Sequence, residues 1–149
     1  MALKIGDTLP DFSAIDTNGT VFHSKDYIGK QSVVIYFYPK DNTPGCTTQA
    51  CGFRDNYQDF KDLGAEVIGI SADSVTSHIK FKSKFNLPFI LLSDSDKKLR
   101  KLFGVENSLI FLPGRETFVA DKNGVILMIF NSMSSKIHIE KALEILKKP

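Results

Sequence analysis

Residues 32–51 read SVVIYFYPKDNTPGCTTQAC. The stretch 32–38 is almost entirely β-branched or aromatic and lacks polar alternation, which predicts a central strand covered on both faces. Residues 39–42 are expected to form a loop, and residues 44–63 a helix with Gly64 at its C-terminal cap. A buried strand followed directly by a helix is typical of an α/β fold, in which functional sites lie beyond the C-terminal ends of the strands.

The rest of the chain alternates between strand-like and helix-like stretches, with no internal repeat and no long linker. Turn residues at 16–19 and 121–124 predict two hairpins. Strands are predicted at 12–15, 21–23, 66–71, 90–92, 117–120 and 125–130, and helices at 74–85, 97–103 and 136–147. One face of the helix over 74–85 is expected to carry Val75, Ile79, Lys82 and Phe85.

This order of elements predicts an α/β fold, a three-layer sandwich with a mixed central sheet, and a thioredoxin-like architecture with an extra N-terminal hairpin is one such solution. The chain has 149 residues, of which 42% are hydrophobic and 24% charged, as in ordinary globular proteins. A single domain over residues 1–149 is therefore expected.

Composition also limits the classes of partner. The formal net charge is +2 and no basic run exceeds a Lys-Lys pair, so no nucleic-acid partner is expected. The longest apolar runs are six residues, whereas a membrane helix needs about 20, so no membrane partner is expected. Two cysteines and no signal-peptide pattern favour a reducing compartment over secretion. The protein would stay where it is made or would have lost a targeting segment.

Cys46 occupies the third position of the predicted helix if Thr43 caps it and Pro44 is its first residue. Unpaired backbone N–H groups and the positive end of the helix dipole would then surround the sulfur and favour a nucleophilic thiolate. The Thr43 hydroxyl would be offered to the N–H of Cys46 or to a group lying against the sulfur. Two plainer interpretations remain open, a simple helix cap at Thr43 and an inert, small hydrophobic residue at Cys46.

Cys51 follows five residues later on the same predicted helix, about 7.5 Å along its axis and about 140° around it. The two α-carbons would then be roughly 8 to 9 Å apart, beyond the roughly 7 Å limit for a disulfide without backbone movement. A Cys46–Cys51 disulfide would therefore require the first turns of the helix to unwind. The alternative is two unrelated core cysteines, and the spacing alone leaves it open.

Pro39, Thr43 and Cys46 match the pattern P-x-x-x-[TS]-x-x-C, and on these residues the chain resembles the peroxiredoxin family. The second cysteine five residues on is similar to the bacterioferritin comigratory protein or peroxiredoxin Q group. The likeness covers nearly the whole chain, and residues 112–118 and 121–125 resemble the plant and cyanobacterial branch in particular.

The resemblance implies a peroxidatic Cys46 and a resolving Cys51. It also implies that Pro39, Thr43 and Arg115 position the substrate, although Arg115 alone would be interpreted as a surface residue. The implied enzyme is a thiol-dependent peroxidase that reduces hydrogen peroxide and organic hydroperoxides, needs no cofactor and serves antioxidant defence and redox homeostasis. Thioredoxin would reduce its intramolecular disulfide. We also expect a monomer, in a chloroplast or in a cyanobacterial or other bacterial cytoplasm.

Two cysteines in one chain also suit two other functions. A general protein disulfide oxidoreductase is disfavoured by the five-residue spacing of the cysteines, and a redox-sensing binding module would expose a surface when the helix unwinds. His23, His78 and His138 are far apart in sequence and lack the spacing of metal ligands, so no metal site is expected. We expect all three to be solvated surface histidines.

Overall fold

The computed structural model describes residues 3–105 and 114–148 of the chain. Its strands form one seven-stranded sheet with the order β2-β1-β5-β4-β3-β6-β7. The strands are β1 (Ser13–Asp16), β2 (Val21–His23), β3 (Ser32–Phe37), β4 (Ala65–Ser71), β5 (Ile90–Ser93), β6 (Glu116–Ala120) and β7 (Ile126–Asn131). The helices are the 3-10 turn η1 (Ser24–Asp26) and α1 (Pro44–Asp55), α2 (Tyr57–Asp62), α3 (Val75–Phe85), α4 (Lys98–Phe103) and α5 (Ser135–Lys147).

The sheet is mixed, as predicted. Strands β3, β4 and β5 run parallel at its centre, whereas β6 and β7 on one side and β1 and β2 on the other pair antiparallel. The N-terminal hairpin and the late hairpin are both confirmed. The central strand β3 is buried on both faces because it lies between β4 and β6 and under both helical layers.

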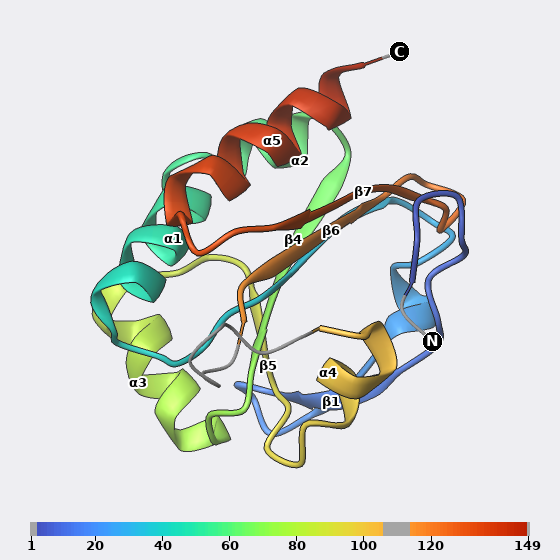
Figure 1. Ribbon diagram of the computed structural model, residues 1–149. Helices are drawn as coiled ribbons and strands as arrows, with labels where there is room; N and C mark the ends of the chain where they lie inside the picture. Colours follow the sequence, from blue (N-terminus) through green and yellow to red (C-terminus); the bar gives the residue numbers. More distant parts are fainter. Residues whose placement is uncertain (1–2, 106–113, 149) are drawn as a thin grey trace.

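Two hydrophobic clusters lie on opposite faces of the sheet and define the three layers (Figure 1). Helices α1, α2, α3 and α5 contribute to one cluster, and α4 and the N-terminal segment contribute to the other. The predicted three-layer α/β sandwich is therefore confirmed. Within the described part of the chain, no helix combines the length and the hydropathy needed to cross a membrane.

The prediction of one helix over 44–63 is wrong in one respect, because the helix is broken. Helix α1 ends at Asp55 and α2 begins at Tyr57, with Asn56 between them at φ −107° and ψ 8°. The Asn56 side-chain amide donates to the carbonyl of Gly52 at 2.8 Å. Such side-chain bonds to the backbone compete with the helical ladder and favour the break at this residue. Gly64 follows α2 in the left-handed region, as expected.

The predicted apolar face of α3 is also wrong in part. Ile79 is 47% exposed, whereas His78 and Phe81 are buried. The Ser74 hydroxyl caps the helix by accepting from the N–H of Ser77, and this start fixes the rotation of the helix. A polar histidine occupies the inward position because it finds buried hydrogen-bond partners, which apolar periodicity does not reveal.

Candidate active site

Cys46 is the third residue of α1 and its side chain is buried, with 1% of the residue exposed. Pro44 is the first helical residue, as predicted, and Thr43 precedes the helix with an extended backbone. The thiol therefore lies at the N-terminus of a twelve-residue helix, just beyond the C-terminal end of the central strand β3. A helix start presents unpaired N–H groups and the positive end of its dipole to such a group.

Arg115 lies against this sulfur. One guanidinium nitrogen, Nη2, donates to Cys46 Sγ at 3.4 Å, and the residue is only 3% exposed. The surface position inferred for Arg115 from sequence alone is thus wrong, because β6 pairs with β3 in a register that places Glu116 opposite Phe37. That register places Arg115, the residue before β6, at the C-terminal end of β3. Helix α1 follows β3 after a short loop.

Gly45 makes room for this approach. A Cβ atom at this position would lie 3.1 Å from Arg115 Nη2, closer than such contacts ordinarily are, and 3.4 Å from Ser135 Oγ, at van der Waals contact. The Ser135 hydroxyl, at the start of α5, donates to the Gly45 carbonyl at 2.6 Å. The absence of a side chain at residue 45 therefore lets Arg115 and α5 both contact the first turn of α1.

Thr43 does not cap the N–H of Cys46, contrary to one of the two expectations for it. Its hydroxyl donates to the carbonyl of Lys40 at 2.9 Å, and the backbone carbonyl of Thr43 accepts from the N–H of Thr47. The side chain instead closes the loop that precedes the helix. Pro39 lies in that loop, half-buried, immediately after the buried Tyr38.

Cys51 lies farther along α1 and is half-buried, and both cysteines are free thiols. It lines a surface cavity of about 520 Å³, which α1 forms together with residues of α5 that include Lys136 and Ile139. At the adjacent Gly52, a Cβ atom would lie 3.0 Å from Ile139 Cδ1. Helix α1 thus packs closely on α5 beside Cys51, while Cys46 faces the core.

The sequence matches the AhpC/TSA family over residues 5–129. The chain is 50% identical to chloroplastic peroxiredoxin Q of Sedum lineare and 53% identical to that of Arabidopsis thaliana, in each case over 144 residues and 95% of this chain. The chain belongs to the peroxiredoxin Q branch of the AhpC/TSA family. It spans 77% of the Sedum protein and 66% of the Arabidopsis protein.

Solved structures of bacterial peroxiredoxins have the same fold. Peroxidoxin BcpB of Mycobacterium tuberculosis superposes with a TM-score of 0.90 at 37% identity, covering 97% of each chain. A cysteine-to-serine mutant of PrxQ from Xylella fastidiosa also gives 0.90, at 35% identity, covering 99% of this chain and 97% of that one. The thioredoxin-like architecture named from the order of elements is therefore confirmed.

Gln49 is a further residue of this peroxiredoxin site that the sequence analysis missed. It is fully buried, and its side-chain oxygen accepts from Arg115 Nη1, the neighbour of the nitrogen that contacts Cys46. Cys46, Gln49, Ala50 and Phe53 form the buried face of α1. The sequence signal for Gln49 is its place in this i, i+3, i+4, i+7 pattern. A polar residue on a buried helix face needs a buried hydrogen-bond partner.

Three buried polar atoms among the described residues have no hydrogen-bond partner, namely Arg115 Nε, Gln49 Nε2 and the Tyr36 hydroxyl. The first two are donors on Arg115, which contacts the Cys46 sulfur, and on Gln49, which bonds to Arg115. Burial, followed by the charge of nearby Cys46, raises the pKa of Tyr36 well above its ordinary value. The Tyr36 phenol therefore stays protonated and does not act as a base.

His138 supports Arg115 from α5, and its predicted exposure is wrong because the residue is fully buried. Its Nδ1 lies 2.7 Å from the Thr117 hydroxyl, and its Nε2 lies 2.6 Å from the Ser132 carbonyl. The N–H of Ser132 in turn donates to the Arg115 carbonyl at 3.2 Å. Burial lowers the pKa of His138 to about 4, so the ring is neutral at pH 7, accepting at Nδ1 and donating at Nε2.

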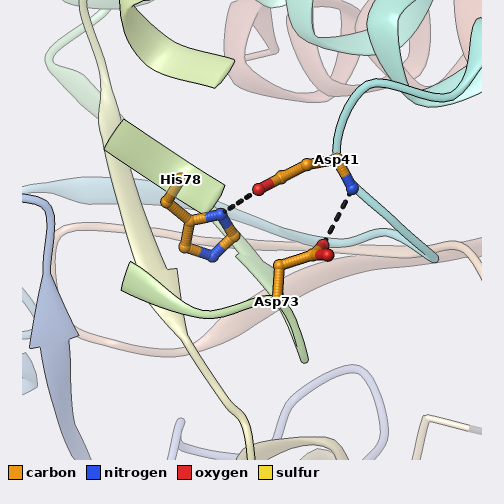
Figure 2. A group of neighbouring side chains, drawn as sticks. All are labelled: Asp41, Asp73 and His78. Atoms are coloured by element: carbon orange, nitrogen blue, oxygen red, sulfur yellow. Dashed lines mark hydrogen bonds and ion pairs between the residues drawn. The ribbon is translucent and has the colours of Figure 1, made fainter. Parts of the chain in front are cut away.

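His78 is also buried, with 1% exposed, so only His23 of the three histidines is exposed as expected. Asp41, Asp73 and His78 bring three potential metal-ligand atoms within 4.8 Å of one another (Figure 2). The Asp41 carboxylate accepts from Tyr38, Ser77 and His78, and Asp73 accepts from Ser71 and from the N–H of Asp41. Hydrogen bonds within the protein thus explain why these three side chains lie close together.

The lowered pKa of His138 predicts a specific acid sensitivity. A histidine in the unfolded chain titrates near 6.5, so between about pH 6.5 and about pH 4 the unfolded state binds more protons at this residue than the folded state. The free energy of unfolding should therefore fall over this interval as pH is lowered, by on the order of 3 kcal/mol from this residue. Urea unfolding at a series of pH values measures the effect.

The variant His138→Gln should lose this part of the pH dependence of the unfolding free energy, since glutamine does not titrate. The matched control is His23→Gln at an exposed position, which should retain the wild-type slope. Identical pH dependence in wild type and His138→Gln would contradict the assignment.

Proposed function

We propose that the protein is a thiol-dependent peroxidase in which Cys46 reduces hydrogen peroxide and organic hydroperoxides. One observation carries the proposal, the contact of the buried Arg115 guanidinium with the sulfur of a cysteine at the start of a helix. A buried cation and the helix N-terminus both stabilise negative charge, on the thiolate before the reaction and on the peroxide oxygens during it. Membership of the peroxiredoxin Q branch supports the same activity.

In the first step the Cys46 thiolate attacks one peroxide oxygen and forms an S–O bond as the O–O bond breaks. The sulfur is oxidised to sulfenic acid, and the other oxygen leaves with a proton as water or an alcohol. Arg115, which contacts the sulfur, and Gln49, which bonds to Arg115, carry unpartnered donors at Nε and Nε2, and peroxide oxygens are suitable acceptors for such donors. Pro39 and Thr43 shape the loop on the other side of the helix start.

In the second step the Cys51 thiol attacks the sulfenic sulfur, an S–S bond forms and water leaves. Because both cysteines are on α1, its first turns must unwind, which breaks the bond from Ser135 to Gly45. Farther along, Phe53 is fully buried and stacks on Tyr36 with ring centroids 4.5 Å apart. This packing favours unwinding that is confined to residues 44–53.

An external dithiol must then supply two electrons and two protons to return the disulfide to two thiols, and we propose thioredoxin as this reductant. Because the resolving cysteine is in the same chain, a monomer suffices for the cycle, and residues 1–149 act as one thioredoxin-like domain. Relatives named as chloroplastic support a plastid location, and a bacterial cytoplasm is the other reducing compartment that suits this chemistry.

Variants of the two cysteines test the assignment of roles. Cys46→Ser should consume no peroxide, because a serine hydroxyl is neither ionised nor comparably nucleophilic at neutral pH. Cys51→Ser should reduce about one equivalent and accumulate sulfenic acid, with thioredoxin-supported turnover greatly reduced. Stopped-flow oxidation with mass spectrometry of the product gives both results. Rapid peroxide consumption by Cys46→Ser but not by Cys51→Ser would reverse the roles.

Gln49 should set the position of Arg115. Gln49→Leu removes the acceptor for Arg115 Nη1, and the second-order rate constant of the first oxidation should fall by about tenfold. Gln49→Glu keeps an oxygen facing Arg115 and should react faster than Gln49→Leu under the same conditions. If Gln49→Leu reacted at the wild-type rate, Gln49 would have no part in positioning Arg115.

A further inference from the structure

The loop between β3 and α1, residues 38–43, is held by side chains that lie outside α1. We propose that the buried Asp41–His78 pair anchors this loop in both redox states, so that unwinding of α1 stops at Thr43 and the helix re-forms from a fixed start. This inference rests on the proposed Cys46–Cys51 disulfide. It assigns to His78 a positioning role, since His78 contacts neither cysteine.

Asp41 is the centre of the anchor and is only 6% exposed. Its Oδ1 accepts from the Tyr38 hydroxyl at 2.6 Å, and its Oδ2 accepts from Ser77 at 2.9 Å and from His78 Nδ1 at 2.6 Å. Its backbone N–H donates to Asp73 Oδ2 at 2.8 Å (Figure 2). The residue is therefore fixed through both its side chain and its backbone.

His78 links this loop to the centre of the sheet. While Nδ1 bonds to Asp41, Nε2 lies 3.0 Å from the carbonyl of Leu92 on β5. Both ring nitrogens therefore face oxygen acceptors, one on the loop and one on the sheet. Removal of the ring would leave the buried Asp41 Oδ2 without one of its two side-chain partners.

None of these bonds involves a residue of α1. The partners of Asp41 lie directly after β3 (Tyr38), after β4 (Asp73) and on α3 (Ser77 and His78), all outside α1. By contrast, the bond from the Thr47 N–H to the Thr43 carbonyl and the bond from Ser135 to Gly45 both end on residues of α1 and are lost. The boundary between the two groups of bonds falls at Thr43.

A fixed loop before α1 helps the helix to re-form when the disulfide is reduced. The first turn is the costly step of helix formation, because several residues must be ordered for one hydrogen bond. Asn42, next to Asp41, has a positive φ of 61°, a conformation that a free chain rarely adopts. By holding this turn, the anchor removes part of the ordering that α1 must otherwise repeat in every catalytic cycle.

Amide exchange followed residue by residue by NMR, on the reduced and the peroxide-oxidised full chain, tests the proposal. Mass spectrometry first verifies the Cys46–Cys51 bond in the oxidised sample. In wild type, oxidation should raise exchange over residues 44–53, while the Asp41 amide keeps its protection. In His78→Leu, exchange of the Asp41 amide in the oxidised form should rise by about tenfold or more, and α1 should regain protection more slowly after reduction by dithiothreitol.

Two variants separate anchoring from general stability. His78→Asn keeps an N–H donor near the position of Nδ1 and should restore most of the Asp41 protection that His78→Leu loses. Phe85→Leu perturbs a half-buried core residue at the C-terminal end of the same helix, away from the loop, and it should leave Asp41 protected in both forms.

Loss of Asp41 protection in oxidised wild type would overturn the anchor while leaving the disulfide mechanism standing, and this result does not depend on any variant folding. Equal effects of His78→Leu and Phe85→Leu would also overturn it. Absence of the Cys46–Cys51 bond after peroxide treatment would overturn the proposed function and the anchor together.

Discussion

A buried guanidinium held against a buried thiol is the contact on which the rest of the site depends. Arg115 reaches Cys46 because β6 pairs with β3, because residue 45 has no side chain, and because Gln49 holds the second guanidinium nitrogen. Behind Arg115, Arg100 donates to the carbonyl of Gly114 at 3.1 Å, and Ser132 donates to that of Arg115. The backbone at Arg115 is thus fixed from two sides before its side chain meets the sulfur, which is the preorganisation that charge stabilisation requires.

In the proposed mechanism, the same helix start is rigid for reaction with peroxide and then unwinds for disulfide formation. The structure divides its contacts accordingly. Helix α5 holds α1 through Ser135 and through the close approach of Ile139 to Gly52, contacts made by small groups on one face of α1. The loop before α1 and the second half of α1 are held by different groups, the Asp41–His78 network and the stacked rings of Phe53 and Tyr36. A short helix has little stability alone, so the loss of a few such contacts is enough to release its first turns.

Most of the fold was predictable from the sequence because strand patterns, turn residues and helix signals agree with one another along the chain. The errors have a common cause. His78, His138 and Gln49 are polar residues in the core, and their burial depends on partners such as Asp41, Thr117 and Arg115 that are between 21 and 66 residues away in sequence. Arg115 was placed near Cys46 only by the family resemblance, since strand pairing between β3 and β6 is a tertiary property. The break at Asn56 depends on a single side-chain bond within an otherwise continuous helical pattern.

The role of Arg115 in stabilising charge on the peroxide is tested most directly by comparing two reactions of Cys46 in wild type and in Arg115→Gln. Second-order rate constants would be measured by stopped flow with hydrogen peroxide and with iodoacetamide, which reports thiolate availability without an O–O bond to polarise. If Arg115 stabilises the charge that develops on the peroxide, the peroxide rate constant falls by about 100-fold or more, while the iodoacetamide rate constant falls by about tenfold or less. Equal falls in both rate constants, or a peroxide rate constant within about twofold of wild type, would show that Arg115 does not stabilise charge on the peroxide.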